Sequence, residues 1–330
     1  MKMMTLGIWI ILSLTMPALT KTENDTIDIE KIRELKEFSH ASGADKFSLY
    51  HHGNQVFRWD APDCDSVKMN TASMVKSWTG LMIGILIDEG RIGSVEDKVC
   101  KYLPEWESAC ENDITIRHLL TMTSGLLRKK PSESVLAQDN MNAFVLQVKL
   151  DTMPESVFSY SNESVQLLGL IIERVCDKSA NACFQDKLFE PLGMDSTQLW
   201  KDKSGNDVAY GGCQTTLEDA AQIGLLLRNK GSWKGKRIVP EKWIDQSLAG
   251  TTQAPYYGYL WWIDKNTNSV AAMGDFGQMT IYFPDLDLIF VRQQSCNNAD
   301  RTKNLNWMGP DFLNLVRSTV KTIETSDKKH

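Results

Sequence analysis

A serine and a lysine one helical turn apart, Ser73 and Lys76, are the residues of this chain best placed to do chemistry. A serine hydroxyl is a weak nucleophile until a base takes its proton. On a helix, residues three apart lie on the same face, so the Lys76 amine comes close to the Ser73 hydroxyl. A lysine that burial deprives of its charge can serve as that base. The pair therefore predicts acyl transfer through a covalent intermediate on Ser73.

The Ser-x-x-Lys spacing alone carries little weight, because it also occurs at Ser318 and at Ser326. The copy at Ser73 differs in its context, since the apolar run Leu81 to Ile87 follows and is long enough for a buried helix. A nucleophile at the start of such a helix gains the helix dipole and free backbone N–H groups, which favour an oxyanion. The alternative is a capping serine beside a lysine whose stem covers apolar surface.

Tyr160-Ser161-Asn162 is a second candidate group, with the one Tyr-x-Asn among eight tyrosines. A tyrosinate near an ammonium group can act as a general base, and an asparagine amide can orient a lysine and a substrate carbonyl. The alternative is a helix start, since Ser161 and Asn162 precede the apolar run Val165 to Ile172. Both interpretations hold together, because a helix N-terminus is a suitable platform for an active site.

Other chemistries lack residues with the required spacing. No Gly-x-Ser-x-Gly sequence occurs, which disfavours the α/β-hydrolase arrangement. The five histidines show no metal-ligand spacing, and two of them, His51 and His52, fall in a predicted hairpin. Gly231 to Lys236 has the composition of a phosphate-binding loop but the wrong spacing. The sequence therefore predicts no metal, nucleotide or nicotinamide site and no cofactor.

The order Ser73-x-x-Lys76, Tyr160-x-Asn162 and Ala272-Met273-Gly274 resembles the penicillin-recognising serine hydrolases. Within them it is most similar to the branch with class C β-lactamases, D-alanyl-D-alanine carboxypeptidases, related esterases and 6-aminohexanoate-dimer hydrolases. The similarity runs from about residue 45 to about residue 295. Four further stretches match the family: Ile114 to Leu126 (with Met122 where histidine is common), Pro191 to Met194, Tyr210 to Gly212 and Tyr257 to Trp262.

This resemblance implies a role for each residue of the site. Ser73 would be the acylated nucleophile, and Lys76 would take or share its proton. Tyr160 would relay that proton to the leaving group and then help to activate the hydrolytic water. Asn162 would hold the lysine and the substrate amide. The oxyanion hole would use the backbone N–H groups of Ser73 and Asp275, an assignment that depends on the alignment of the preceding strand.

The strand before Asp275 is informative about the substrate. Relatives that bind β-lactams or D-Ala-D-Ala ends begin its triplet with lysine or histidine and continue with a hydroxyl residue, which grips a substrate carboxylate. This chain has Ala272 and Met273 instead. A lost charge-assisted bond to a carboxylate is worth roughly 1.5–3 kcal/mol, or tenfold or more in affinity. Hydrolysis of another ester or amide, such as a short peptide or oligoamide, is therefore favoured over efficient turnover of a β-lactam.

Substrate contacts are expected from five residues near this strand, namely Gly274, Gly277, Gln278, Tyr257 and Trp261. Gly277-Gln278 is similar to the esterase and 6-aminohexanoate-dimer hydrolase members. The aromatic side chains would line an apolar acyl or aryl pocket. Core packing is the alternative for them, because aromatic residues next to Gly258 suit a strand.

These features predict an exported serine hydrolase that cleaves an ester or amide bond through an acyl-enzyme on Ser73. The enzymatic alternative is a D,D-carboxypeptidase or a class C-like β-lactamase. The alternative of another class is a non-catalytic binding protein on the same fold, which the joint presence of the four catalytic side chains disfavours. The identity of the substrate and the oligomeric state stay open.

Composition and the first residues bound the partners and the compartment. At 330 residues and 42% hydrophobic content, the chain can bury one large core or two joined ones. A net charge of −6 argues against a nucleic-acid partner, since phosphates need a basic face. Residues 1–21 have the pattern of a signal peptide, with an apolar part too short to span a bilayer. We expect a secreted or periplasmic protein without stable membrane insertion; an uncleaved anchor is the alternative.

Seven cysteines in an exported chain predict disulfides. Cys100 with Cys110 and Cys176 with Cys183 each bracket a short loop and are the preferred pairs. Which of the other three stays free is left open by the sequence; they are Cys64, Cys213 and Cys296.

Apolar patterns predict the elements that position these residues. We expect a helix over 29–38, hairpins over 47–59 and 278–292, mostly helices over 105–250, and a closing helix over 310–323. Strands from both ends of the chain with helices between them imply one discontinuous α/β (α+β) domain. Its antiparallel sheet would be flanked by helices and interrupted by a mostly helical insertion, as in the β-lactamase/transpeptidase-like fold.

The predicted division of the chain has four parts. A signal peptide over 1–21 precedes the first part of the α/β domain, 22–104, which carries the nucleophile helix. The helical region, 105–250, follows, and 251–330 supplies the closing strands and the C-terminal helix. The active site is expected in the groove between the sheet domain and the helical region.

Overall fold

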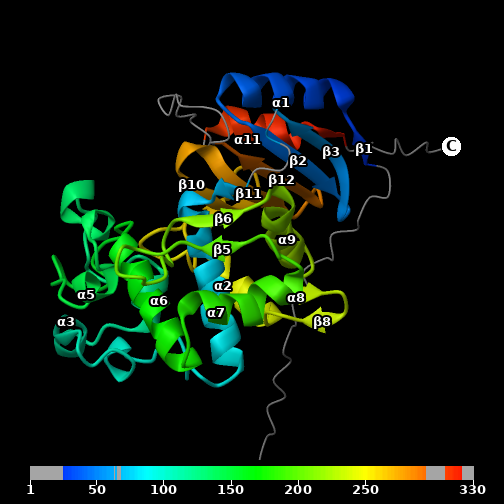
Figure 1. Ribbon diagram of the computed structural model, residues 1–330. Helices are drawn as coiled ribbons and strands as arrows, with labels where there is room; N and C mark the ends of the chain where they lie inside the picture. Colours follow the sequence, from blue (N-terminus) through cyan, green and yellow to red (C-terminus); the bar gives the residue numbers. More distant parts are fainter. Residues whose placement is uncertain (1–24, 63, 65–67, 295–308, 322–330) are drawn as a thin grey trace, which may run out of the picture.

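The computed structural model describes residues 25–62, 64, 68–294 and 309–321 of the chain, and the predicted signal peptide lies outside these ranges. Figure 1 shows a β-sheet with α1 and α11 on one side and most of the other helices on the opposite side. Among the described helices, none is long and apolar enough to cross a membrane.

The α-helices are α1 (Ile29–Ala41), α2 (Val75–Asp88), α3 (Glu107–Glu111), α4 (Ile116–Leu120), α5 (Met141–Val145), α6 (Asn162–Cys176), α7 (Ala180–Phe184), α8 (Glu190–Leu192), α9 (Leu217–Arg228), α10 (Glu241–Ser247) and α11 (Pro310–Arg317). Shorter or irregular turns are η1 (Ala72–Met74), η2 (Val99–Lys101), η3 (Pro131–Glu133), η4 (Val135–Ala137), η5 (Gln185–Phe189, a π-helix) and η6 (Asp275–Gly277). The strands are β1 (Thr26–Ile27), β2 (Lys46–His51), β3 (Asn54–Asp60), β4 (Met69–Asn70), β5 (Gln198–Leu199), β6 (Cys213–Thr215), β7 (Ser232–Trp233), β8 (Lys236–Arg237), β9 (Trp262–Asp264), β10 (Ser269–Gly274), β11 (Gln278–Phe283), β12 (Leu288–Gln293) and β13 (Val320–Lys321).

Strands from both ends of the chain form one six-stranded antiparallel sheet in the order β3-β2-β12-β11-β10-β9. Both predicted hairpins are present. β2 and β3 turn at His52 and Gly53, whose φ angles are both positive, as a two-residue turn between right-twisted strands requires. The pairing of β2 with β12 joins segments more than 200 residues apart, with the helical part of the chain between them. The predicted fold class is confirmed.

Alternating side chains of the central strands face two separate layers of the core. In β10, Ala271 and Met273 pack in the layer under α1 and α11, where Leu35 of α1 also lies. Val270 and Ala272 of the same strand face the larger core, which the other helices build. Both faces of this strand are therefore covered by helices, and all six of its residues are buried.

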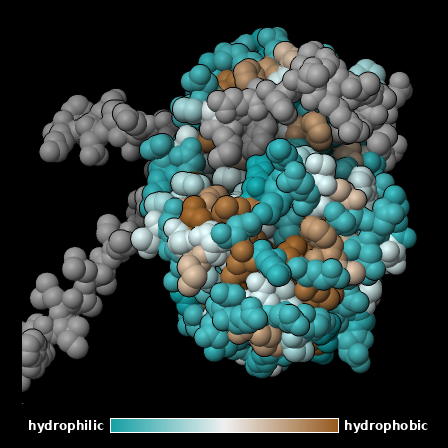
Figure 2. All heavy atoms as spheres, turned by 90° about the vertical axis from the view of Figure 1, so that its left-hand side faces the viewer, coloured by the Kyte–Doolittle hydropathy of each residue, from teal (hydrophilic) through white to brown (hydrophobic). Residues whose placement is uncertain are grey.

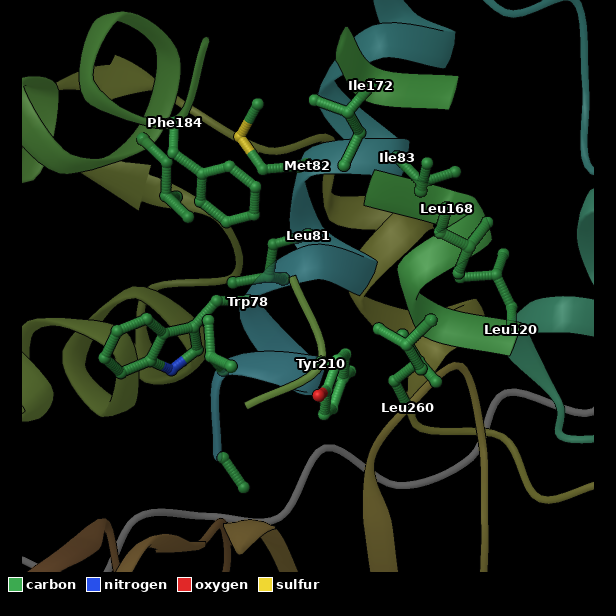
Figure 3. Close-up of a cluster of buried hydrophobic side chains, with 14 of the residues drawn as sticks. Trp78, Leu81, Met82, Ile83, Leu120, Leu168, Ile172, Phe184, Tyr210 and Leu260 are labelled. Atoms are coloured by element: carbon green, nitrogen blue, oxygen red, sulfur yellow. The ribbon is translucent and has the colours of Figure 1, made fainter. Parts of the chain in front are cut away.

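Helix α2 runs through the larger core and is buried at every position from Val75 to Leu86. In Figure 3, Trp78 and Ile83 project from this helix toward opposite sides, with Phe184 on one side and Leu168 of α6 on the other. Apolar neighbours around the whole helix fix its rotation. The residues at its N-terminus, where the predicted nucleophile lies, are held in place by that packing.

The closing helix is shorter than predicted, because α11 ends at Arg317 and not at residue 323. The hydroxyl groups of Ser318 and Thr319 donate hydrogen bonds to carbonyl groups of the last helical turn, which competes with continued helix. The chain then forms β13, which pairs with β1. A second departure is the small sheet β4-β6-β5, which the mostly helical pattern over 105–250 did not predict.

Both preferred disulfides are present, Cys100–Cys110 and Cys176–Cys183. Cys64 is disulfide-bonded as well. The free cysteine among the described residues is Cys213, which is buried. Burial raises the pKa of its thiol, so the group stays protonated at neutral pH and is a poor nucleophile.

Candidate active site

Ser73 and Lys76 meet at the start of the buried helix. Ser73 lies in the single turn η1, which continues directly into α2, and the Lys76 Nζ donates a hydrogen bond of 2.9 Å to the Ser73 Oγ. Lys76 is 1% exposed because the helix that carries it is enclosed on all sides. The distance that a helical spacing predicts is thus present, together with the burial that a lysine base needs.

The end of β10 packs directly against the turn that carries Ser73. A side chain at Gly274 would come within 2.3 Å of the Thr71 carbonyl oxygen and 2.9 Å of the Ser73 backbone nitrogen, so glycine is required there. Ala72 takes a positive φ of 46°, which is uncommon for a residue other than glycine. Its backbone N–H donates to the Asn70 side chain at 2.8 Å, which helps to hold this conformation. The strand and the turn therefore fix the position of Ser73 from both sides.

A second hydrogen bond holds the Lys76 amine, which donates to the Tyr210 carbonyl oxygen at 2.5 Å. The rings of Tyr160 and Tyr210 lie 5.0 Å and 5.4 Å from the Lys76 Nζ. Burial lowers the pKa of Lys76 to about 7, although Asp275 and other nearby carboxylates oppose this effect. Burial therefore favours the uncharged amine, which can accept a proton.

Tyr160 reaches the same point from the segment before α6. Its ring stacks on Trp262 at 5.7 Å and packs edge to face against Tyr257 at 6.2 Å. Burial raises the pKa of the Tyr160 phenol well above its usual value, and a hydrogen bond with Ser73 opposes part of that effect. Burial therefore favours the protonated phenol at neutral pH, and the role of Tyr160 in proton transfer stays a prediction.

The predicted helix start after Tyr160 is present, and α6 begins at Asn162. The Ser161 hydroxyl caps the helix by accepting the Ser164 N–H at 3.2 Å. Met122, which replaces the histidine common in the family, accepts the Ser161 N–H with its sulfur at 3.4 Å. Among the described residues, no hydrogen bond joins Asn162 to Lys76. The lysine-holding role of Asn162 stays a prediction.

Two cavities meet at Ser73, and four residues line both of them: Ser73, Leu136, Asn162 and Asp275. The smaller, of about 90 Å³, is polar and also includes Arg128 and Lys129. The larger, of about 330 Å³, is mostly apolar, and its other lining residues include Met141, Trp200, Val208, Tyr210 and Phe276. A cavity of about 670 Å³ around Trp106 is larger still, but none of the predicted catalytic residues lines it.

Figure 2 shows hydrophobic side chains gathered among hydrophilic ones on the face of the molecule that carries the helical part. The exposed large hydrophobic residues of this part include Leu127, Leu136 and Trp200. Of these, Leu136 and Trp200 line the larger cavity at Ser73. Exposed apolar side chains at the mouth of an apolar cavity are a feature of ligand sites.

Five residues were expected to contact substrate, and none of them lines either cavity at Ser73. Tyr257 and Trp261 are fully buried, so core packing, the alternative considered for them, is what the structure has. The Gln278 amide faces inward and donates to the Gln294 carbonyl oxygen at 2.6 Å. A side chain at Gly277 would collide with Arg292. Gly274 abuts the nucleophile turn but is buried.

Asp275, whose backbone N–H is predicted to complete the oxyanion hole, opens the turn η6 at the end of β10 and lines both cavities. The buried guanidinium of Arg292 holds this turn, because it donates to the carbonyl oxygens of Phe276 and Gly277 at 3.0 Å and 2.6 Å. Phe276 takes a positive φ of 64° in it. The hydrogen bonds from Arg292 thus stabilise the turn from the protein interior, and Asp275, its first residue, is exposed.

Sequence reasoning missed several residues of the site. Arg128 and Trp200 occur in no recognised spacing, and the Tyr210 carbonyl contributes through its backbone, which leaves no signal in side-chain patterns. One signal was available: Tyr210 to Gly212 is a stretch that matches the family, and all three of its residues line the larger cavity.

Comparisons with known proteins identify the family of this chain and agree with its fold. The sequence model of the Beta-lactamase family matches residues 46–307. The 6-aminohexanoate-dimer hydrolase of Paenarthrobacter ureafaciens is 25% identical over 274 residues, which cover 73% of this chain and 68% of that protein.

Solved structures show the same fold. A Bacillus anthracis protein, provisionally named a 6-aminohexanoate-dimer hydrolase, superposes with a TM-score of 0.72 at 23% identity, covering 86% of this chain and 80% of that one. EstCE1, described as a hydrolase with promiscuous acyltransferase activity, superposes with a TM-score of 0.69 at 16% identity, covering 88% and 97%. At these identities the likeness concerns the fold.

Proposed function

The chain belongs to the Beta-lactamase family of serine hydrolases, and from this premise we propose that it cleaves an ester or amide bond through an acyl-enzyme on Ser73. One observation carries the proposal. The Lys76 amine is buried, lies 2.9 Å from the Ser73 hydroxyl and has a pKa of about 7. A base with a pKa near the working pH is the most effective one for proton transfer.

In the first step, the neutral Lys76 amine takes the Ser73 proton while Oγ forms a bond to the substrate carbonyl carbon. The carbonyl oxygen becomes an oxyanion, for which the backbone N–H groups of Ser73 and Asp275 are the proposed donors. When the tetrahedral intermediate collapses, the Tyr160 phenol gives its proton to the leaving nitrogen or oxygen and receives one from the Lys76 ammonium. Water then attacks the acyl carbon while its proton passes through the Tyr160 phenol to the Lys76 amine. The bond between the acyl carbon and Oγ breaks as Oγ takes a proton from Lys76, which releases the acid and free Ser73.

The two cavities support a division of the substrate. The apolar cavity of about 330 Å³ has the size and lining for an acyl or aryl group, with Trp200 and Phe276 among its walls. The smaller polar cavity lies beside Arg128 and would take the leaving part of the substrate. We propose an ester, peptide or oligoamide with an apolar acyl group as the substrate; the Paenarthrobacter relative is named for the hydrolysis of a 6-aminohexanoate dimer.

A second candidate function rests on Arg128. Its guanidinium lies 6.0 Å from the centre of the Tyr160 ring and lines the smaller cavity. A guanidinium at this place can bind a substrate carboxylate, which Ala272 at the start of the strand triplet cannot do because it has no charge. This observation favours the alternative of a D,D-carboxypeptidase or a class C-like β-lactamase, whose substrates carry a carboxylate. Export of the protein is proposed on its disulfides, which persist in oxidising compartments.

Intact-mass spectrometry tests these proposals. The protein is exposed to p-nitrophenyl butyrate, a fluorophosphonate and a penicillin, beside Ser73→Ala and a control, Ser204→Ala, at an exposed loop serine. An adduct with the ester or the fluorophosphonate that Ser73→Ala loses and Ser204→Ala keeps would support the proposed function. A stable Ser73-dependent penicillin adduct would favour the second candidate. No adduct with any probe, in folded protein, would leave the non-catalytic binding protein.

A further inference from the structure

Asp25, His51 and His52 bring three metal-ligand side chains together at the turn between β2 and β3. Each residue offers one ligand atom, and these atoms all lie within 4.8 Å of one another. The spacing along the chain gave no such signal, because Asp25 lies far from the two histidines in sequence. It precedes β1, and the fold returns it to the hairpin turn.

The cluster lies away from the active site. His51 pairs with Leu288 at the end of β2, and Leu288 pairs with Phe283 of β11. Gln278, at the other end of β11, pairs with Gly274 beside the Ser73 turn. Gln278 and Phe283, the two ends of β11, are five residues apart, which corresponds to roughly 17 Å at 3.3–3.4 Å per residue.

His51 has a buried nitrogen without a partner. His51 is 6% exposed, and its Nε2 atom has no hydrogen-bond partner among the described residues. A buried polar atom without a partner costs free energy and calls for a physical reason. A bare imidazole nitrogen in a buried position is the kind of atom that binds a metal ion.

His52 has a carboxylate beside one of its two ring nitrogens. Its Nδ1 lies 3.1 Å from the Asp287 Oδ2, which leaves Nε2 available. Arg228 holds Asp287 in turn through bonds of 2.6 Å and 2.8 Å. His52 has a positive φ of 51°, and its ring centre lies 3.9 Å from that of His51. Successive residues of a regular strand point to opposite faces, so the turn conformation is what places both rings together.

We propose that Asp25, His51 and His52 bind one divalent transition-metal ion, with zinc as the best match. Two imidazole nitrogens and a carboxylate oxygen suit zinc, which forms bonds of about 2.0–2.2 Å to them in tetrahedral geometry, with water as the fourth ligand. Ligand atoms around such an ion lie roughly 3.3–3.5 Å apart, so small side-chain rotations close the cluster. The ion joins the segment before β1 to the β2–β3 turn and stabilises the edge of the sheet.

Zinc binding by the untagged, chelator-treated chain tests the proposal. Equilibrium dialysis with metal analysis, in competition with a chromogenic chelator, gives the stoichiometry and the Kd. We expect one ion per chain, and at least a tenfold loss of affinity in His52→Gln and in Asp25→Asn. The matched control is His40→Gln, which removes an exposed imidazole from α1 and should bind zinc as the unchanged chain does.

The thermal unfolding midpoint gives a second readout. Zinc should raise the Tm of the unchanged chain and of His40→Gln, but not that of His52→Gln, because an ion that binds the folded state stabilises it. Hydrolysis of p-nitrophenyl butyrate should be the same in His52→Gln, since the cluster is remote from Ser73. Absence of binding at 0.1 mM zinc would overturn the proposal. So would equal affinity in both ligand variants, or loss of the ion in His40→Gln.

Discussion

Replacing Lys76 with methionine should stabilise the protein while it removes the proposed general base. Methionine keeps most of the length of the side chain without the charge, so it fits a site that is 1% exposed. Burial lowers the pKa of Lys76 from 10.5 to about 7, because the ammonium form loses its hydration there. The unchanged protein therefore bears a free-energy cost for this group, and the cost depends on pH.

The size of this cost follows from the linkage between proton binding and folding. Below pH 7 Lys76 is charged in the folded and the unfolded chain, and a pKa lower by about 3.5 corresponds to about 5 kcal/mol. Between about pH 7 and 10.5 the unfolded chain keeps its proton while the folded protein has lost it, so the cost decreases as pH rises. At pH 9 about 2 kcal/mol remains.

The variant also loses the hydrogen bonds of Lys76 to the Ser73 Oγ and the Tyr210 carbonyl oxygen. This loss lowers its stability by about 1–3 kcal/mol, with little dependence on pH. The net expectation is that Lys76→Met is more stable than the unchanged protein by a few kcal/mol at pH 5.5. That advantage should shrink by about 3 kcal/mol between pH 5.5 and pH 9.

Urea unfolding followed by tryptophan fluorescence at pH 5.5 and pH 9 measures both values. Lys36→Met is the control, because it removes an exposed lysine from α1. Ester hydrolysis by Lys76→Met should fall by about 10²- to 10⁴-fold, the usual contribution of a general base. The reasoning is refuted if the stability difference is the same at both pH values, or if the variant is the less stable protein at pH 5.5.

Three further predictions concern the chemistry and its support. The kcat/KM for p-nitrophenyl butyrate should fall about tenfold per pH unit below about pH 7, because the Lys76 ammonium cannot accept a proton; a flat profile from pH 5 to 9 would contradict this. Trp200→Ala enlarges the apolar cavity, so kcat/KM across p-nitrophenyl esters of increasing acyl length should shift toward longer chains, and an unchanged preference would exclude this wall as an acyl contact. Arg292→Met leaves the Phe276 and Gly277 carbonyl groups without their donor, which should lower the free energy of unfolding by about 2–5 kcal/mol and reduce kcat more than it changes KM. Urea unfolding measures the stability of Arg292→Met, and steady-state kinetics measure its kcat and KM. A wild-type stability together with a wild-type kcat would show that the turn does not depend on Arg292.

Local patterns were sufficient where one segment determines the outcome. The spacing of Ser73 and Lys76 on a helix predicted a contact that the structure has at 2.9 Å. The pattern over residues 47–59 predicted the first hairpin, and Ser161 predicted the start of α6. In each case the residues that make the interaction lie within a few positions of one another, so the backbone geometry alone brings them together.

Contacts between distant segments escaped the same reasoning. Trp200 lines the cavity at Ser73 while Trp261 is buried in the core, although both are tryptophans near the ends of short strands. Sequence cannot distinguish an aromatic side chain that faces a cavity from one that faces the core, because neighbours from other segments decide this. Asp25 and His51 likewise meet because β1 is placed beside the sheet, which no spacing along the chain reports.

Lys76 separates the two contributions most clearly. Helical periodicity alone predicts that this lysine lies one turn after Ser73 on an apolar helix, because it fixes which residues share a face. The charge of that lysine depends on segments that are distant along the chain. The segments around α2 exclude water from its amine, and removal of water is what lowers the pKa to about 7. The amine becomes a base because the whole fold encloses it.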